Sequence, residues 1–213
     1  LRTARRGYRI CGEEVFQTSS QNAGASWTNE QHLGSGSAPS LTTWMDSQGG
    51  CDLYSVYRRL DNSYWYIKLR VGQRRTGGGF TLGNEIDISD QAISMTIDTR
   101  PVVVRTFYRE GNSREERLVA AWENNAGIAV RDLAFISGTW GSVGEVRYTG
   151  SSYKRPSIGV NSLEGLEWQP TLFMTYDNGN DIFLARTDYP EQPMTVEASI
   201  VPQSYSAQIA GES

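Results

Sequence analysis

Three segments of the chain end an apolar run with an aromatic residue and an acid, just before a turn rich in Gly and Asn. The aromatic and acidic residues are Trp44, Asp46, Trp122, Glu123, Tyr176 and Asp177. Aromatic rings can stack on the apolar faces of sugars, and carboxylates accept hydrogen bonds from sugar hydroxyls. The pairs therefore predict a surface that binds carbohydrate. For each tryptophan or tyrosine taken singly, packing in a hydrophobic core is the favoured alternative.

Two arginines precede prolines, in Arg100-Pro101 and Arg155-Pro156. A guanidinium group can bind a carboxylate through two parallel hydrogen bonds, which suits a carboxylate-bearing ligand. The same geometry suits a neighbouring acid of the chain itself, and the sequence leaves both alternatives open. We include Arg100 and Arg155 among the predicted ligand-binding residues.

The acids also raise the question of hydrolysis, since paired carboxylates can cleave a glycosidic bond. Five of the 24 acids lie near the repeated turns, namely Asp46, Asp52, Glu123, Asp177 and Asp181. Acids in such turns can instead serve the backbone geometry alone. We expect no cofactor, although oxygen ligands for calcium are available among Asp177, Asn178, Asn180 and Asp181.

The aromatic–acid pairs lie in a repeated phrase of two strands joined by a short turn. The three copies run over residues 41–58, 118–131 and 172–186, and strand signals fill most of the remaining chain. Only the charged run 110–117 has a helix-like composition, and we interpret it as a hydrophilic connection or a single turn. Four strands in about 40–50 residues make the blade of a propeller. The sequence thus predicts an all-β chain, a small β-propeller of four to five four-stranded antiparallel blades.

The blades are expected in a single domain over residues 1–213. Their predicted bounds are 1–36, completed by a C-terminal strand at 204–209, then 37–95, 96–150 and 151–200. If that C-terminal strand does not close the ring, the chain is part of a larger propeller.

One segment resembles a known motif. Residues 20–27 read Ser-Gln-Asn-Ala-Gly-Ala-Ser-Trp, similar to the Asp-box of sialidase-like propellers, Ser-x-Asp-x-Gly-x-Thr-Trp, with Asn22 and Ser26 as departures. Weaker echoes lie at 61–65 and 137–140. The resemblance implies a positive φ at Gly24 and a Trp27 packed between blades. Because the box lies away from the active face in that family, it implies a fold rather than an activity. The family topology also implies that the repeated turns join the second and third strands of each blade and gather with Arg100 and Arg155 on the opposite face.

The resemblance also implies what a sialidase would need: three arginines on the substrate carboxylate, a tyrosine nucleophile assisted by a glutamate, and an aspartic acid. Arg100-Pro101 and Arg155-Pro156 lack the residue that the family places between Arg and Pro, and no coherent set emerges. We therefore favour a lectin-like protein that binds glycans without catalysis. A sialidase-like glycoside hydrolase is the second hypothesis, and a structural or protein-interaction propeller within a larger assembly is the third.

Net charge and composition argue against some classes of partner. A net charge of −4 argues against nucleic acid, and no apolar run approaches the about 18 residues that span a bilayer. The start at Leu1 and the lack of a signal peptide predict a processed chain or a fragment, and we expect a secreted protein. Cys11 and Cys51 could form one disulfide or remain two buried thiols. A single histidine, His32, excludes a histidine-based metal cluster.

Overall fold

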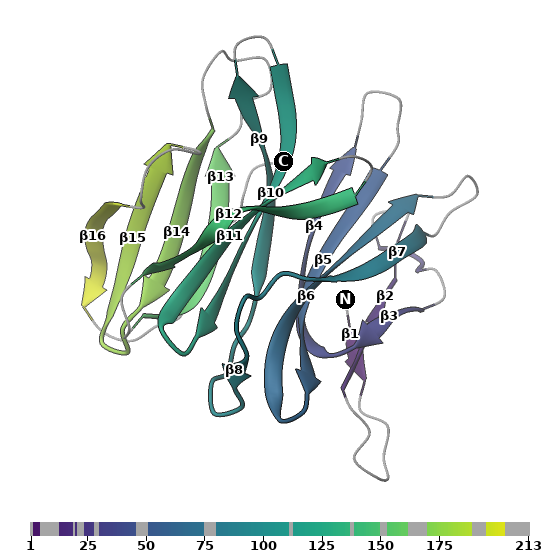
Figure 1. Ribbon diagram of the computed structural model, residues 1–213, viewed down its shortest axis with the longest axis horizontal. Helices are drawn as coiled ribbons and strands as arrows, with labels where there is room; N and C mark the ends of the chain where they lie inside the picture. Colours follow the sequence, from purple (N-terminus) through teal and green to yellow (C-terminus); the bar gives the residue numbers. More distant parts are fainter. Residues whose placement is uncertain are drawn as a thin grey trace. The chain divides into compact units, whose positions relative to one another are not determined.

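A computed structural model describes residues 2–4, 13–18, 20, 24–27, 30–45, 51–74, 80–110, 113–136, 139–149, 153–161, 170–188 and 195–202. These residues form β-strands and turns without a helix, and every strand pairing among them is antiparallel. None of the described segments is a helix long and apolar enough to cross a membrane. The chain divides into a first unit, Leu1–Thr96, and a second unit, Ile97–Ser213 (Figure 1).

In the first unit, one sheet has the order β1 (Arg2–Ala4), β2 (Glu14–Gln17) and β3 (Gln31–Ser35). A second sheet follows the chain order through β4 (Ser37–Met45), β5 (Cys51–Asp61), β6 (Tyr64–Arg74) and β7 (Phe80–Asp87). The short strand β8 (Ile93–Ser94) pairs with the beginning of β6. Each strand of the second sheet thus pairs with the next, as short turns between neighbouring strands require.

The core of the first unit forms where β2 and β3 pack on the second sheet. Val15, Leu33 and Tyr57 are fully buried there, with Leu82 against them. A Cβ on Gly34 would lie 2.5 Å from the Tyr57 hydroxyl oxygen, so glycine is needed for this close approach. The Arg70 guanidinium donates to the carbonyl of Leu33 and ties the two sheets together.

The second unit contains two sheets in which each strand again pairs with the next. The first has β9 (Val102–Glu110), β10 (Ser113–Asn124), β11 (Gly127–Ile136) and β12 (Thr139–Thr149). The second has β13 (Lys154–Asn161), β14 (Thr171–Asp177), β15 (Asp181–Asp188) and β16 (Thr195–Pro202). Figure 1 shows the first of these sheets in teal to green and the second in green to yellow.

Alternate side chains of these two sheets share one hydrophobic core. Its buried members are Val119, Ala121, Ile128, Val130, Ile158, Leu172, Met174, Tyr176 and Ala185. Successive side chains of a strand point to opposite faces, so one face of each sheet is apolar and packs against the other. Burying a large apolar side chain contributes about 1.5–3 kcal/mol, enough to hold the two sheets as one body.

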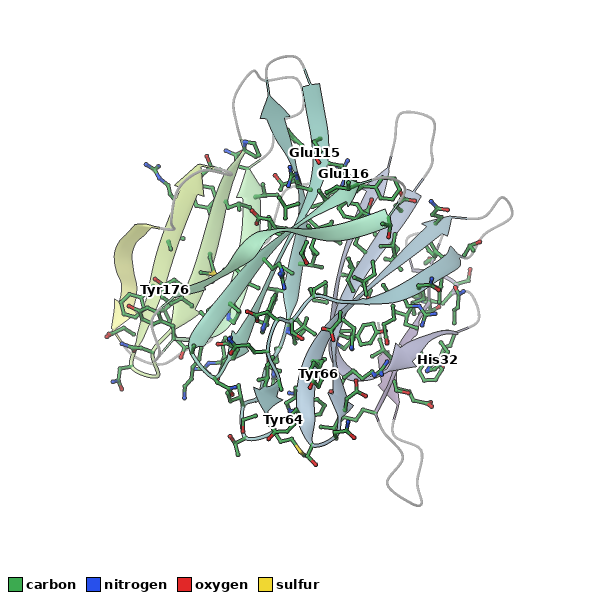
Figure 2. The ribbon with its side chains drawn as sticks, in the orientation of Figure 1. His32, Tyr64, Tyr66, Glu115, Glu116 and Tyr176 are labelled. Carbon is green, nitrogen blue, oxygen red and sulfur yellow. The ribbon has the colours of Figure 1, made fainter. Side chains whose placement is uncertain are left out.

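The all-β, antiparallel prediction is confirmed, whereas the propeller and its blade number remain predictions. The charged run 110–117 was wrongly interpreted as a connection, because residues 113–117 belong to β10. Ion pairs stabilise this polar end of the hairpin: Arg105 Nε lies 2.6 Å from Glu116 Oε1, and Arg117 Nη2 lies 2.6 Å from Glu115 Oε2. Figure 2 labels both glutamates on β10.

The segment that resembles an Asp-box joins β2 and β3. Gly24 has a φ of +90°, and its N–H donates to Ser20 Oγ over 2.8 Å. Trp27 is 63% exposed, so the expectation that it packs between blades is wrong. Asn22, Cys11 and the predicted closing strand 204–209 lie outside the described residues.

Candidate functional site

One end of the second unit brings together three of the eight predicted ligand-binding residues, Glu123, Arg155 and Asp177. Strand β10 ends at Glu123 and Asn124, β14 ends at Asp177, and β13 begins at Lys154 and Arg155. The register places Lys154 opposite Asp177, so the start of β13 and the end of β14 coincide. We call Glu123, Lys154, Arg155 and Asp177 the turn end of the second unit.

Arg155 is held in place by both acids of the turn end. Its Nε donates to Asp177 Oδ2 and its Nη2 to Asp177 Oδ1, each over 2.7 Å, and its backbone N–H donates to Glu123 Oε2 over 3.4 Å. The Asp177 side chain is 2% exposed, whereas that of Arg155 is 44% exposed. The hydrogen bonds and charge of Asp177 raise the pKa of Arg155. A fixed, permanently charged guanidinium bonded to Asp177 therefore faces solvent, while the backbone N–H of the same residue donates to Glu123.

The backbone of Arg155 is strained. Its φ is +50°, in the left-handed region that costs a residue with a Cβ about 1–2 kcal/mol, and Pro156 follows it. The register of β13 shifts here, which marks a β-bulge. Such strain persists where surrounding contacts overdetermine it, and it is common at ligand sites.

Sequence reasoning missed a second copy of this bulge. Ala38 has a φ of +49° and precedes Pro39 in β4, where the register also shifts. The shared signal is a residue followed by Pro-Ser in the first strand of a sheet. Ala38 offers no guanidinium, so only the second unit presents an arginine from this bulge among the described residues.

Glu123 is half buried, and this burial raises the pKa of its carboxyl. The Arg155 N–H and the charge of Lys154 lower the pKa by less, while the charges of Asp177 and Asp98 raise it. Strand alternation places Glu123 on the same face of β10 as Val119 and Ala121, the face that forms the core between the sheets. Glu123 thus lies where that core opens to solvent.

The two aromatic residues predicted for this site are not available for stacking. Trp122 is fully buried, and Tyr176 lies in the core between the sheets. Burial raises the pKa of Tyr176 to about 12, and its ring contacts Tyr153 and Phe183, with centroids 4.5 and 5.6 Å away. Figure 2 shows Tyr176 near the β14–β15 turn. Tyr153 and Phe183 are only partly buried, and they are the accessible rings that sequence reasoning missed.

Arg100 does not contact Glu123 or Asp177 through any bond seen here. Its Nε and Nη2 both lie within 2.9 Å of Asp98 Oδ2, and both side chains are well exposed. The structure thus shows, for Arg100 as for Arg155, pairing with an acid of the same chain.

The first copy of the aromatic–acid phrase differs from the other two. Its turn joins β4 and β5, the first and second strands of their sheet, whereas the turns after Glu123 and Asp177 join second and third strands. The expectation that all three turns occupy equivalent positions is therefore wrong for this copy. Strand β4 pairs Trp44 with Asp52, but the Trp44 side chain and all of Asp46 lie outside the described residues.

The first unit contains a tyrosine, a glutamate and arginines in contact, a combination relevant to hydrolysis. The Tyr57 hydroxyl donates to Glu85, which also pairs with Arg59. The charge of Arg70 acts on the same tyrosine and lowers its pKa, by less than burial and Glu85 raise it. Tyr57 is fully buried, and burial followed by the adjacent Glu85 raises its pKa far above the ordinary value. A buried phenol that resists ionisation is a poor nucleophile.

The β14–β15 turn uses its oxygen atoms for backbone geometry. Asp177 Oδ1 accepts from the Gly179 N–H over 2.9 Å, and Asn178 Oδ1 accepts from Asn180 and Asp181 over 2.9 and 2.8 Å. These are the groups that calcium would require. Within the described part of the chain, no three His, Cys, Asp or Glu residues are grouped closely enough to hold a metal.

The turn end of the second unit therefore offers donors and acceptors of hydrogen bonds beside partly exposed rings. No known protein family, curated protein or solved structure matches this chain. The chemistry of the site itself thus carries the functional inference.

Proposed function

We propose that the chain is a carbohydrate-binding protein without catalytic activity, and that it binds glycans at the turn end of the second unit. The observation that supports this proposal is Arg155, whose half-exposed guanidinium is fixed by buried Asp177 and whose backbone N–H donates to the Glu123 carboxyl. A sugar hydroxyl both donates and accepts hydrogen bonds, so it suits adjacent guanidinium and carboxyl groups.

The rigidity of the arrangement favours binding. Arg155 has five N–H donors in its guanidinium, and Asp177 engages two of the nitrogens. Because Asp177 already orders the guanidinium, the Arg155 side chain would lose little conformational entropy when a ligand binds. Tyr153 and Phe183 could contribute apolar contact with a sugar ring.

We further propose that the sheets are consecutive blades of a small propeller. Two features support this: each sheet follows the chain order, and β9 and β13, the first strands of their sheets, lie next to each other. A glycan ligand is also consistent with secretion, the location that we propose for the protein. In the described residues the arginine-bearing bulge occurs once, which favours a single site of this kind rather than one per blade.

Glycoside hydrolysis is the second candidate, and the raised pKa of Glu123 favours it. A carboxyl whose pKa is raised by burial can act as a general acid. The partner carboxylate would be Asp177, whose two oxygens already accept from Arg155 and Gly179. That saturation makes binding the stronger proposal.

A glycan-array screen of the purified chain, with a parallel incubation for released sugar, separates the candidates. We expect binding without release. Release that Glu123→Gln abolishes would establish hydrolysis instead. If the chain neither binds nor releases sugar, both proposals are contradicted, and a protein partner becomes the next candidate to test.

A further inference from the structure

The hairpin of β5 and β6 in the first unit has features of a binding surface. Its loop consists of Asn62 and Ser63, whose φ values of +49° and +70° are typical of a tight type I′ turn. The loop joins the second and third strands of its sheet, the position that the turns after Glu123 and Asp177 occupy in theirs. The acid at this turn is Asp61, and an exposed tyrosine, Tyr64, follows it.

The register of the sheet places two tyrosines between charged residues. Asp61 lies opposite Tyr64 and Arg59 opposite Tyr66, so these four side chains share one face. Tyr64 is 49% exposed, and Tyr66 is partly buried. Figure 2 shows both tyrosines at the hairpin end of β6. Because they are two residues apart on one strand, their Cα atoms lie about 7 Å apart, and we call the two side chains the aromatic strip.

A continuous network of ion pairs borders this strip. Glu85 pairs with Arg59, Arg59 Nε lies 3.1 Å from Asp61 Oδ1, and Asp61 Oδ2 lies 3.9 Å from Lys68 Nζ. Lys68 Nζ in turn lies 2.8 Å from Asp87 Oδ2 and 5.3 Å from the centre of the Tyr66 ring. The acids and bases alternate, which fixes the positions of their side chains.

The network also indicates the charge of a ligand. Three acids (Asp61, Glu85 and Asp87) face two paired bases (Arg59 and Lys68), and Arg70 lies opposite Glu85 in the register, so the cluster is close to neutral. An ionic ligand would have to displace an internal ion pair. A neutral ligand with many hydroxyls can use the remaining lone pairs and N–H groups while the pairs stay intact.

We propose that Arg59, Asp61, Tyr64 and Tyr66 form a second saccharide-binding surface, for neutral oligosaccharides. The tyrosine rings stack on sugar rings, and Arg59 and Asp61 bind hydroxyls beside them. This surface belongs to the first unit and shares no residue with the turn end of the second unit. Either surface can therefore fail without the other.

The test is a titration of the ¹⁵N-labelled chain, followed by amide resonances, with cellohexaose, xylohexaose, maltohexaose and chitohexaose in turn. We expect at least one of these to shift the resonances of residues 59–66. Tyr64→Ala should weaken that binding about three- to tenfold, the loss of one aromatic contact. Tyr64→Phe should retain it, as should the control Phe135→Ala, which removes an equally exposed ring of the second unit.

The same spectra keep the two surfaces distinct. Shifts at 59–66 should persist in an Arg155→Lys background, because that change affects only the turn end of the second unit. The proposal is overturned if none of the four oligosaccharides shifts 59–66, or if Tyr64→Ala binds as tightly as the unchanged chain. Absence of shifts at Glu123 and Arg155 would bear on the proposed function alone.

Discussion

Asp177→Asn should destabilise the second unit by about 1–2 kcal/mol. Asp177 is 2% exposed and accepts two hydrogen bonds from Arg155 and one from Gly179. Asparagine retains an oxygen that can accept from Gly179, but it loses the negative charge and one acceptor for the guanidinium. The change therefore removes the bidentate ion pair with little change in volume.

The magnitude follows from the different exposure of the two partners. A hydrogen bond to a charged group contributes about 1.5–3 kcal/mol, and removing one member of a fully buried pair costs about 3–5 kcal/mol. Here the residue left behind is Arg155, whose side chain is 44% exposed and can be solvated by water. Solvent screening reduces the loss to the lower range.

The assay is urea denaturation at pH 7, followed by tryptophan fluorescence. The matched control is Asp98→Asn, since Asp98 also pairs with an arginine, Arg100, but both side chains are well exposed. An exposed pair contributes at most about 1 kcal/mol, so the control should lose less than about 1 kcal/mol and less than Asp177→Asn. Equal free energies of unfolding for the two variants would refute the ordering of Arg155 by Asp177.

Four further changes test other parts of the structure. Burial raises the pKa of Glu123 above 4.5, so the charged form of Glu123 costs stability at neutral pH. Glu123→Gln removes that charge and should raise Tm at pH 7. This gain should vanish as the pH falls below 4.5, where Glu123 is protonated in both states. Trp122→Ala should cost about 3–5 kcal/mol in urea denaturation, because this ring is fully buried. Gly34→Ala should cost about 1–3 kcal/mol in the same assay, since a Cβ there would lie 2.5 Å from the Tyr57 hydroxyl oxygen. Ala38→Gly should be neutral or raise the free energy of unfolding by up to about 1 kcal/mol, because relief of the positive φ offsets the greater entropy of unfolded glycine.

The strands could be predicted because alternating apolar residues and Gly/Asn turns are local signals. Residues 113–117 were not predicted as part of a strand, since Glu115, Glu116 and Arg117 are polar and the strand there is stabilised by ion pairs with neighbours. The alternation of apolar and polar residues does not indicate such ion pairs. The Arg155 bulge was not predicted either, because the residue before a proline ordinarily adopts an extended conformation. The positive φ of Arg155 depends on contacts with Asp177 and Glu123.

The sequence pointed to three residues of the candidate site. Glu123 and Asp177 were singled out from their turns and Arg155 from its Arg-Pro pair, and the structure brings these three residues together. For Trp122 and Tyr176 the structure shows the alternative of core packing, and the sequence left the choice open because a local pattern does not tell which face of a strand another sheet covers. Tyr64 was missed for the converse reason: exposure at a hairpin depends on what packs nearby.

The most direct test of glycan binding at the turn end is calorimetric titration with the strongest glycan from the array. The chain is compared with Arg155→Lys and with Arg186→Lys, an exposed arginine about 16 Å from the β14–β15 turn along β15. Lysine keeps the charge but loses the planar fork, so Arg155→Lys should weaken binding about tenfold while Arg186→Lys leaves it unchanged. Equal affinity in all three would contradict the account.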